Sequence, residues 1–366
     1  MAVPLLDLKR QYATIKDKTD AAVLKVLEHC KFILGPEVKE LEDKIAALSG
    51  VGFGIGVASG TDALLLALHA AGVGPGDEVV TSNFSFFASA GVVSRLGARP
   101  VFIDIEPDTY NIDPKLIEKA VTKKTKAIMP VHLFGQLADM DPIMELARAR
   151  KLAVIEDAAQ AIGAEYKGKR AGSFGEFGCF SFYPSKNLGG AGDGGMIVTN
   201  DKSRYDFAEI LRVHGAHPKY FHKVIGYNSR LSTIQAAILL VKLEYLDAWS
   251  EKRRVHAKIY DAAFRGTAIK TPVAKNYSYH IYNQYTIAAE NREDLMAGLK
   301  EKGIGHEIYY PVPFNRQECF KALGYKPHDF PVSEKAAAQV VSIPIYPELT
   351  SAEQEEVIEA VKSISA

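Results

Sequence analysis

The chain contains 366 residues, of which 47% are hydrophobic and 24% are charged. This length suffices for two domains of ordinary size, and the apolar content excludes a chain that is disordered throughout. The 44 basic and 44 acidic residues cancel, so the basic excess typical of a nucleic-acid-binding protein is absent. Three widely separated cysteines without a C-x-x-C pair argue against a disulfide framework or a zinc knuckle, and they favour a reducing compartment.

The first residues do not predict a secretion signal. Asp7, Lys9 and Arg10 interrupt the apolar stretch that a signal peptide needs. The apolar run 63–73 is broken by His69 and is too short to cross a bilayer. We therefore expect a cytoplasmic protein that binds neither membrane nor nucleic acid.

Amphipathic helical patterns come first, in residues 11–28 and 36–48, and Gly50 is a candidate C-cap for the second. From residue 51, short runs rich in Val, Ile and Phe alternate with helical patterns. The runs that predict strands are 51–58, 78–82, 100–104, 126–132 and 152–157. The helical patterns between them are 61–71, 86–96, 114–121 and 140–150. This alternation predicts an α/β domain with a mostly parallel sheet covered on both faces.

The second half of the chain has a different pattern. Two strands are expected at 178–183 and 195–199, and a long charged helical region follows at 232–264. Beyond it we expect a strand at 283–289, a helix at 292–301, a strand at 305–310 and a terminal helix at 351–363. The chain is accordingly divided into a large domain, residues 1–245, and a smaller C-terminal α+β domain, residues 246–366.

Glycine-rich segments offer one candidate phosphate site. Residues 50–56 and 190–195 have G-x-G spacing but no following helix start, so they do not favour a dinucleotide site. In ASGTDAL, the chain leaves a strand, turns at Gly60 and opens an apolar helix that Ser59 or Thr61 can cap. Free N–H groups at such a helix start can bind phosphate, although an ordinary capped helix explains the same pattern.

Two further segments carry reactive side chains. VIEDAAQ ends a strand at Glu156 or Asp157, at the edge where open α/β sheets bind ligands, although a helix-capping aspartate gives the same pattern. In SFYPSKN, Lys186 enters a glycine-rich loop, as a candidate Schiff-base nucleophile or as a surface lysine. A phosphate site, a strand-end acid and a loop lysine together meet the needs of pyridoxal 5'-phosphate (PLP).

These motifs and their order resemble the DegT/DnrJ/EryC1/StrS family of sugar aminotransferases, within the fold-type I PLP-dependent enzymes. The likeness extends over nearly the whole chain and includes FILGPEVKELE, ASGTDALLLAL, VIEDAAQAIGAEYKGKRAGSFG, FSFYPSKNLGGAGDGG and GYNSRLSTIQAAIL. The resemblance implies a large domain with a mostly parallel seven-stranded sheet between helices, and a smaller α+β domain. It also implies a PLP-dependent aminotransferase of amino-sugar biosynthesis.

The resemblance further implies a role for each matching residue. Lys186 matches the lysine that binds PLP, Asp157 the acid at the pyridine nitrogen, and Gln160 the residue packed near the ring. Phe86 aligns with the aromatic that stacks on the ring, Phe84 is the competing candidate, and either can be a core residue. The residues expected to hold the phosphate are Gly60, Thr61, Ser181 and Asn228. The resemblance places Asn228 in the other subunit of a homodimer with shared active sites.

Departures from the family pattern lie where the resemblance places the substrate. Asn283-Gln284-Tyr285 replaces His-Gln-Tyr, Asn315 stands at a histidine position, and Arg-Leu-Ser at 230–232 replaces Arg-Leu-Asp. The candidate substrate contacts are Tyr183, Arg230, Tyr309, Tyr310 and Asn315, of which Tyr309 and Tyr310 are equally explained as packing residues.

The expected substrates are glutamate, as amino donor, and a keto sugar linked to UDP or dTDP. The segments YNSR at 227–230 and GDGG at 192–195 look more like members that aminate 3-keto sugars, so C3 is favoured over C4. A PLP-binding regulatory protein without turnover is the alternative from another class. His214 and His217 have i, i+3 spacing, but no third ligand matches, so no metal site is expected.

Overall fold

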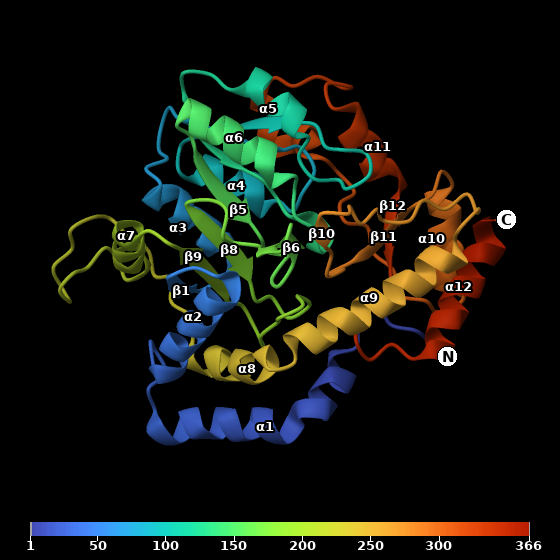
Figure 1. Ribbon diagram of the computed structural model, residues 1–366, viewed down its shortest axis with the longest axis horizontal. Coiled ribbons are helices and arrows are strands. Elements are labelled where there is room, and N and C mark those ends of the chain that lie inside the picture. Colours follow the sequence, from blue (N-terminus) through green and yellow to red (C-terminus); the bar gives the residue numbers. More distant parts are fainter. Residues whose placement is uncertain (1, 366) are drawn as a thin grey trace.

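The structure is a computed structural model that describes residues 2–365. A large sheet lies among the helices (Figure 1). It has seven strands in the order β1-β9-β8-β5-β4-β2-β3. These strands are β1 (Phe53–Val57), β2 (Glu78–Ser82), β3 (Arg99–Ile103), β4 (Thr125–Met129), β5 (Ala153–Asp157), β8 (Phe177–Ser181) and β9 (Gly195–Thr199). Within the sheet only β9 runs antiparallel to its neighbours, which confirms the expected fold class.

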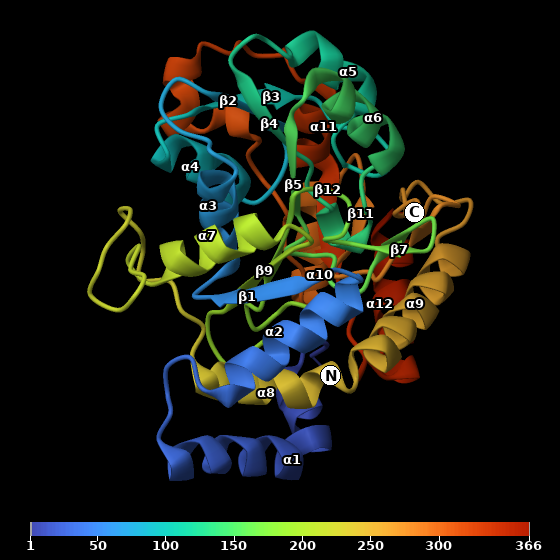
Figure 2. The same cartoon turned by 60° about the vertical axis from the view of Figure 1, so that its left-hand side comes forward.

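Helices cover both faces of this sheet (Figure 2). One face carries α3 (Gly60–Ala70), α4 (Ala88–Arg95) and α7 (Lys202–Arg212). The other carries α2 (Pro36–Ser49), α5 (Pro114–Ala120), α6 (Met140–Arg150) and α8 (Thr233–Leu243). Helix α1 (Leu8–His29) packs against the outer side of α8. A sheet buried on both faces requires strands that are apolar on both sides, as these are.

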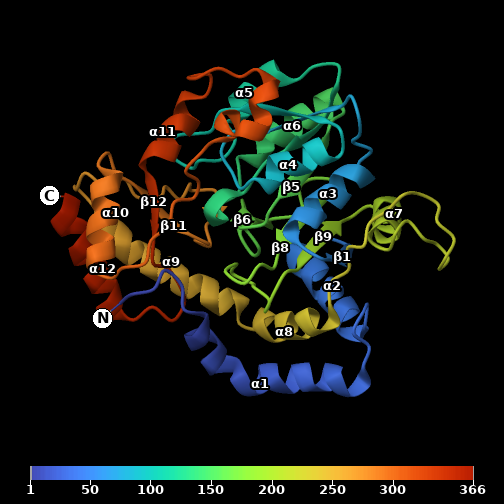
Figure 3. The same cartoon turned by 180° about the vertical axis from the view of Figure 1, so that it is seen from behind.

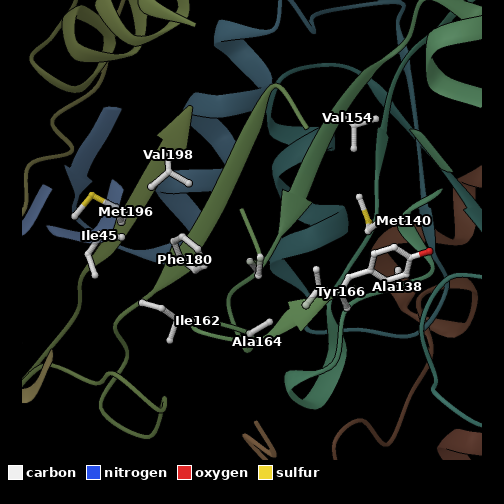
Figure 4. Packing of buried hydrophobic residues seen from close by; sticks show 14 of the residues in the cluster. Ile45, Ala138, Met140, Val154, Ile162, Ala164, Tyr166, Phe180, Met196 and Val198 are labelled. Atoms are coloured by element: carbon white, nitrogen blue, oxygen red, sulfur yellow. The ribbon is translucent and has the colours of Figure 1, made fainter. Parts of the chain in front are cut away.

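Side chains alternate along each strand between the two layers. Val154 of β5 joins Phe180, Met196 and Val198 in the core beneath α2 and α8 (Figure 4), whereas Ile155 joins the core beneath α3. Because the side-chain period of a strand is two, the next two residues of β5, Glu156 and Asp157, also point to opposite faces.

The C-terminal part contains a second, smaller core (Figure 3). Helices α9 (Leu246–Ala263), α10 (Arg292–Glu301) and α12 (Ser351–Ser365) pack around the antiparallel pair β11 (Tyr285–Ala288) and β12 (Val340–Ile343). The side chain of Val3 is part of this core. Its backbone is held there by two hydrogen bonds, since its N–H donates to the Gly303 carbonyl and its carbonyl accepts from the Gly305 N–H. A three-stranded sheet of β10 (Ser278–Tyr279), β6 (Glu165–Tyr166) and β7 (Lys169–Arg170) lies between the two parts.

One predicted element is divided in the structure, and one is wrong. The helical region 232–264 is two helices, α8 and α9, separated at Glu244 and Tyr245. Residues 305–310 were expected to form a strand but do not, because within this segment only Glu307 makes a bridge, to Ser342. The partner of β11 is instead β12, whose residues are all buried and therefore show no alternation. Two helices, α7 and α11 (Pro331–Gln339), were not predicted.

The expected domain boundary at residue 245 stays a prediction. Part of the chain beyond it packs on the large sheet, where Phe314, Phe320 and Phe330 surround Phe102. None of the helices formed by residues 2–365 combines the length and apolar character needed to cross a membrane.

Candidate active site

Asp157 ends β5 at the carboxyl edge of the sheet and is 4% exposed. Ser89 of α4 donates a hydrogen bond to its Oδ2 (2.7 Å), and the Ala159 N–H donates to its Oδ1 (3.2 Å). Burial raises the pKa of Asp157, whereas these two donors and the charge of Lys186 oppose the shift. The carboxyl group is thus held in one orientation, and it has no ion-pair partner within 4 Å among residues 2–365.

Lys186 lies in the loop after β8, where its N–H donates to the Tyr183 carbonyl (2.9 Å). Its side chain has no hydrogen-bond or ion-pair partner in the part of the chain that the structure describes. Lys186 as a whole is half-buried, but protein atoms enclose its amine. This desolvation lowers the pKa of Lys186 to about 8, and the negative charge of Asp157 opposes the shift. The unprotonated, nucleophilic fraction of this amine near neutral pH is therefore much larger than that of an ordinary lysine, although it remains the minor form.

Glycines bring the start of α3 against the ends of two strands. Ser59 caps α3 by accepting from the Asp62 N–H (3.0 Å). A Cβ added to Gly60 would lie 2.6 Å from the Cβ of Ser181, and one added to Gly195 would lie 2.7 Å from the Gly60 nitrogen. Only glycine permits these approaches, so the free N–H groups of the helix start and the Ser181 hydroxyl lie side by side.

Gln160 links two other segments at this edge. Its Oε1 accepts from the Phe134 N–H (2.6 Å), and its Nε2 donates to the Tyr310 hydroxyl (3.0 Å). The Phe86 ring lies 6.1 Å from the Tyr310 ring and is 56% exposed, whereas Phe84 is fully buried in the core. Phe86 is therefore the one of the two phenylalanines that is accessible for stacking.

The other candidate residues occupy different surroundings. Thr61 is half-buried in the first turn of α3, and Tyr183 is exposed. Tyr309 packs edge-on against Tyr310. Arg230 is half-buried, and its side chain has no hydrogen-bond or ion-pair partner among the described residues. Asn228 is exposed in the segment that follows the loop after α7, where it bridges Val213.

Asn315 has a structural use that its sequence position did not indicate. Its N–H donates to the Asn83 Oδ1 (2.8 Å), and its own Oδ1 accepts from the Asn83 Nδ2 (2.9 Å). Its Nδ2 donates to Glu334 (3.1 Å). Both ends of the amide hold the fold together, so the geometry favours an anchoring role over the expected substrate contact.

Sequence reasoning missed Ser89, and it named Glu156 as an alternative strand-end acid without its partner His132 on the opposite face of β5. Glu156 is fully buried and accepts hydrogen bonds from the N–H groups of Gly172, Phe174 and Gly175. His132 also contacts Glu156 (3.0 Å), and because its Nδ1 accepts from a backbone N–H, its Nε2 is the donor. A charged residue at an inward position of a strand was the available signal for Glu156, whereas nothing local identifies Ser89.

His214 and His217, the two histidines with i, i+3 spacing, have no metal-binding surroundings in the described chain. Residues 2–365 contain no group of three or more His, Cys, Asp or Glu side chains that could hold a metal ion. His214 and His217 lie in the loop after α7, where the His214 carbonyl contacts the ring of His222.

Comparison with known proteins identifies the family. The DegT/DnrJ/EryC1/StrS aminotransferase family matches residues 13–362. The chain belongs to this family.

A relative named pleiotropic regulatory protein, from Geobacillus stearothermophilus, is 51% identical over 99% of this chain and 98% of its own length. The UDP-2-acetamido-2-deoxy-3-oxo-D-glucuronate aminotransferase of Pseudomonas aeruginosa is 47% identical over 96% of this chain and 97% of its own. The crystal structure of S. venezuelae DesV in complex with a ketimine intermediate has a TM-score of 0.97 and 41% identity, covering 99% and 98% of the two chains.

The residues at the sheet edge of this family member fit a phosphorylated aldehyde cofactor. An enclosed, unpaired amine suits an aldehyde, and a carboxyl group without an ion-pair partner suits a protonated ring nitrogen. The space where Gly60, Gly195 and Ser181 meet suits a phosphate.

Proposed function

We propose that this DegT/DnrJ/EryC1/StrS family member is a PLP-dependent aminotransferase that transfers an amino group from glutamate to a keto sugar linked to UDP or dTDP. The observation that carries the proposal is the Lys186 amine, enclosed and unpaired within the electrostatic reach of Asp157. A surface lysine would be hydrated and protonated at neutral pH, whereas this one has a pKa of about 8.

Several residues of this chain would hold PLP. Asp157 would bind the ring nitrogen, with Phe86 and Gln160 at the ring. The phosphate would be bound by Gly60, Thr61 and Ser181, together with Asn228 of the partner subunit. When bound, PLP supplies an aldehyde that condenses with amines and a ring that withdraws electrons from the substrate carbon.

The chain itself supplies the proton transfers and their electrostatics. The free Nζ of Lys186 would take a proton from the substrate carbon that carries the amino group and, as general acid, would deliver it across that nitrogen to the carbon supplied by the aldehyde of PLP. The donors Ser89 and Ala159 favour the anionic form of Asp157 against the effect of burial. An anionic Asp157 in turn favours a proton on the ring nitrogen by about 1–3 pKa units.

A homodimer is part of the proposal. The loop between α7 and α8 extends from the body of the molecule (Figure 1) and exposes Tyr220 (78%), Phe221 (69%) and Ile225 (92%). Exposed apolar residues grouped in this way favour burial by another protein surface. Because Asn228 follows this loop directly, a second copy seated on it would bring Asn228 to the neighbouring subunit.

We favour a 3-keto sugar as the acceptor. The P. aeruginosa relative is named for a 3-oxo nucleotide sugar, and the segment YNSR at 227–230 agrees with that choice. A 4-keto sugar is the alternative acceptor.

The test begins with the purified protein loaded with PLP. Glutamate should convert its absorbance to that of the pyridoxamine form, and 3-keto UDP- or dTDP-sugars should restore it and yield an amino sugar identified by mass and NMR. Product from only 4-keto sugars would overturn the C3 preference. Lys186→Ala, as the control, should not turn over.

A regulatory protein without turnover is the second candidate. It is favoured by the name of the G. stearothermophilus relative, which describes regulation and no reaction. PLP binding without any spectral response to glutamate would support this reading and would refute the aminotransferase.

A further inference from the structure

A small polar cavity lies beside the Lys186 loop. Its polar lining consists of Ser185, Arg253, Asn283, Gln284, Tyr309 and Ser342. Its volume is about 40 Å³. A cavity of this size admits ordered water or a small polar group. Ser185 immediately precedes Lys186, so the cavity adjoins the loop that carries the reactive amine.

Arg253 of α9 is a buried cation without a paired anion. It is 3% exposed, and its Nη1 donates to the carbonyls of Ile345 (2.7 Å), Tyr282 (3.2 Å) and Asn283 (3.4 Å). Its Nε and Nη2 have no hydrogen-bond partner within residues 2–365. Glu348 acts on Arg253 only from beyond ion-pair distance. A buried guanidinium without a carboxylate is costly, so a ligand that supplies one gains a strong charge-assisted contact.

Other groups at this cavity are also donors without acceptors. The Ser185 hydroxyl, the Tyr309 hydroxyl and the Nε2 of Gln284 have no hydrogen-bond partner in the described chain. The Oε1 of Gln284 accepts from the Asn283 Nδ2 (2.5 Å), which fixes the amide of Gln284. The buried Oδ1 of Asn283 also lacks a partner. The cavity therefore presents one cation, several free donors and one free acceptor, the Asn283 Oδ1, and its polar groups are incompletely satisfied.

We propose that this cavity binds a carboxylate of the amino donor, with Arg253 as its cationic anchor and Gln284, Ser185 and Tyr309 as further donors. This inference rests on the proposed aminotransferase function. The lining of the cavity favours this ligand, because a buried cation and several free donors attract an anionic group. Its position beside Lys186 suits a ligand whose amine must reach the same catalytic loop.

Separate measurement of the two half-reactions tests this site. In Arg253→Lys, which keeps the charge but loses the planar fork, the apparent Kd for glutamate should rise about tenfold or more. In Gln284→Leu, which leaves the backbone contacts of Arg253 in place, it should rise several-fold. In Arg253→Lys, the reaction of the pyridoxamine form with the keto sugar should be slowed much less than the reaction with glutamate. Gln339→Leu, at a half-buried glutamine outside the cavity, is the matched control.

Calorimetric titration of the PLP-loaded protein with glutarate gives a second readout without turnover. Glutarate should bind the unmodified protein. Its Kd should rise about tenfold or more in Arg253→Lys and several-fold in Gln284→Leu. The Kd of UDP should be the same in all three proteins. Equal glutarate binding in the three proteins, or weaker binding of UDP alone, would overturn the carboxylate site. If glutamate is not converted at all, the aminotransferase proposal fails, and the glutarate titration still decides the carboxylate site.

Discussion

Lys186 and Asp157 reach the carboxyl edge of the sheet from different segments, and the protein shifts their pKa values in opposite directions. Burial lowers the pKa of Lys186 to about 8 and raises that of Asp157. Each charge partly offsets the shift of the other, so the two groups are coupled although they form no ion pair. Such opposed shifts at one site are typical of residues that exchange protons.

The pKa of Lys186 can be measured in the protein without PLP. Because protonated amines do not react, acetylation of Lys186 should rise with a midpoint at about pH 8 and level off by about pH 9. The exposed Lys44 in the same sample serves as the reference, and mass spectrometry of the peptides gives both profiles. Modification of Lys186 that still rises above about pH 10, as for an ordinary lysine, would contradict the desolvated amine.

Asp157→Asn should lower kcat by about 10–1000-fold, because the amide no longer favours a proton on the ring nitrogen by about 1–3 pKa units. The variant keeps the size of the side chain, and PLP should still bind. Asp43→Asn, at an exposed carboxylate paired with Lys39, is the control and should leave kcat unchanged. If the Asp157→Asn enzyme retained more than half of its kcat, the assigned role of Asp157 would be wrong.

At the scale of elements, the junction of α3, β8 and β9 depends on glycines. Neighbouring strands and a helix start meet there at distances that leave no room for a Cβ at Gly60 or Gly195. On the opposite face, Glu156 joins β5 to the 172–175 turn and to His132. The two residues that end β5 thus have separate tasks, one at the candidate site and one in the fold.

Gly60→Ala should weaken PLP binding about tenfold or more. The added Cβ would lie 2.6 Å from the Cβ of Ser181, so the helix start or Ser181 must move, at a cost of about 1–3 kcal/mol. Gly74→Ala is the matched control, because its added Cβ meets no atom within 4 Å. Fluorescence titration with PLP measures both. Equal affinities in the two variants would count against the phosphate site.

Glu156→Gln should lower the free energy of unfolding by about 1–3 kcal/mol. Whichever way the new amide turns, its NH₂ group faces at least one backbone N–H that now donates to the carboxylate. Urea denaturation followed by circular dichroism measures the change. Glu40→Gln, in an exposed pair with Lys44, should cost less than about 1 kcal/mol. A similar, small change in both variants would show that the network contributes little.

Sequence patterns predicted the parallel strands because each is a short run of buried Val, Ile or Phe followed by a helical pattern. They failed at β12, whose residues are all buried, and at 305–310, where the expected strand is reduced to a single bridge. Motifs identified Asp157 and Lys186 as candidates. They could not identify Ser89, Asn83 or Arg253, because the surroundings of these residues come from segments far away in the sequence.

At the scale of the whole molecule, the C-terminal part contacts the large sheet at several places. Asp104, next to β3, accepts from the N–H groups of Val332 and Ser333 at the start of α11. Asn83 and Asn315 exchange hydrogen bonds nearby. The chain on either side of this contact, which includes Tyr309 and Tyr310, is therefore attached to the large sheet at the ends of β2 and β3.

The exposed loop after α7 gives a prediction for the assembly. Phe221→Ser with Ile225→Ser should weaken the proposed dimer about hundredfold, since each apolar side chain contributes ~1.5–3 kcal/mol when buried. Sedimentation velocity should then show monomers, and activity should fall with the dimer fraction. Val273→Ser, at an exposed apolar residue before β10, is the control. Persistent dimers in the double variant would place the interface elsewhere.

The hydrogen bonds of Val3 impose an order on folding. The backbone of Val3 pairs with Gly303 and Gly305, and its side chain is enclosed in the smaller core. During synthesis, the segment around Val3 therefore cannot form its native contacts until residues 303–305 have been made. Closing so long a loop is entropically expensive, which favours late docking of this segment onto a sheet that has already formed. The N-terminal residues would then dock last, after the large sheet has formed without them.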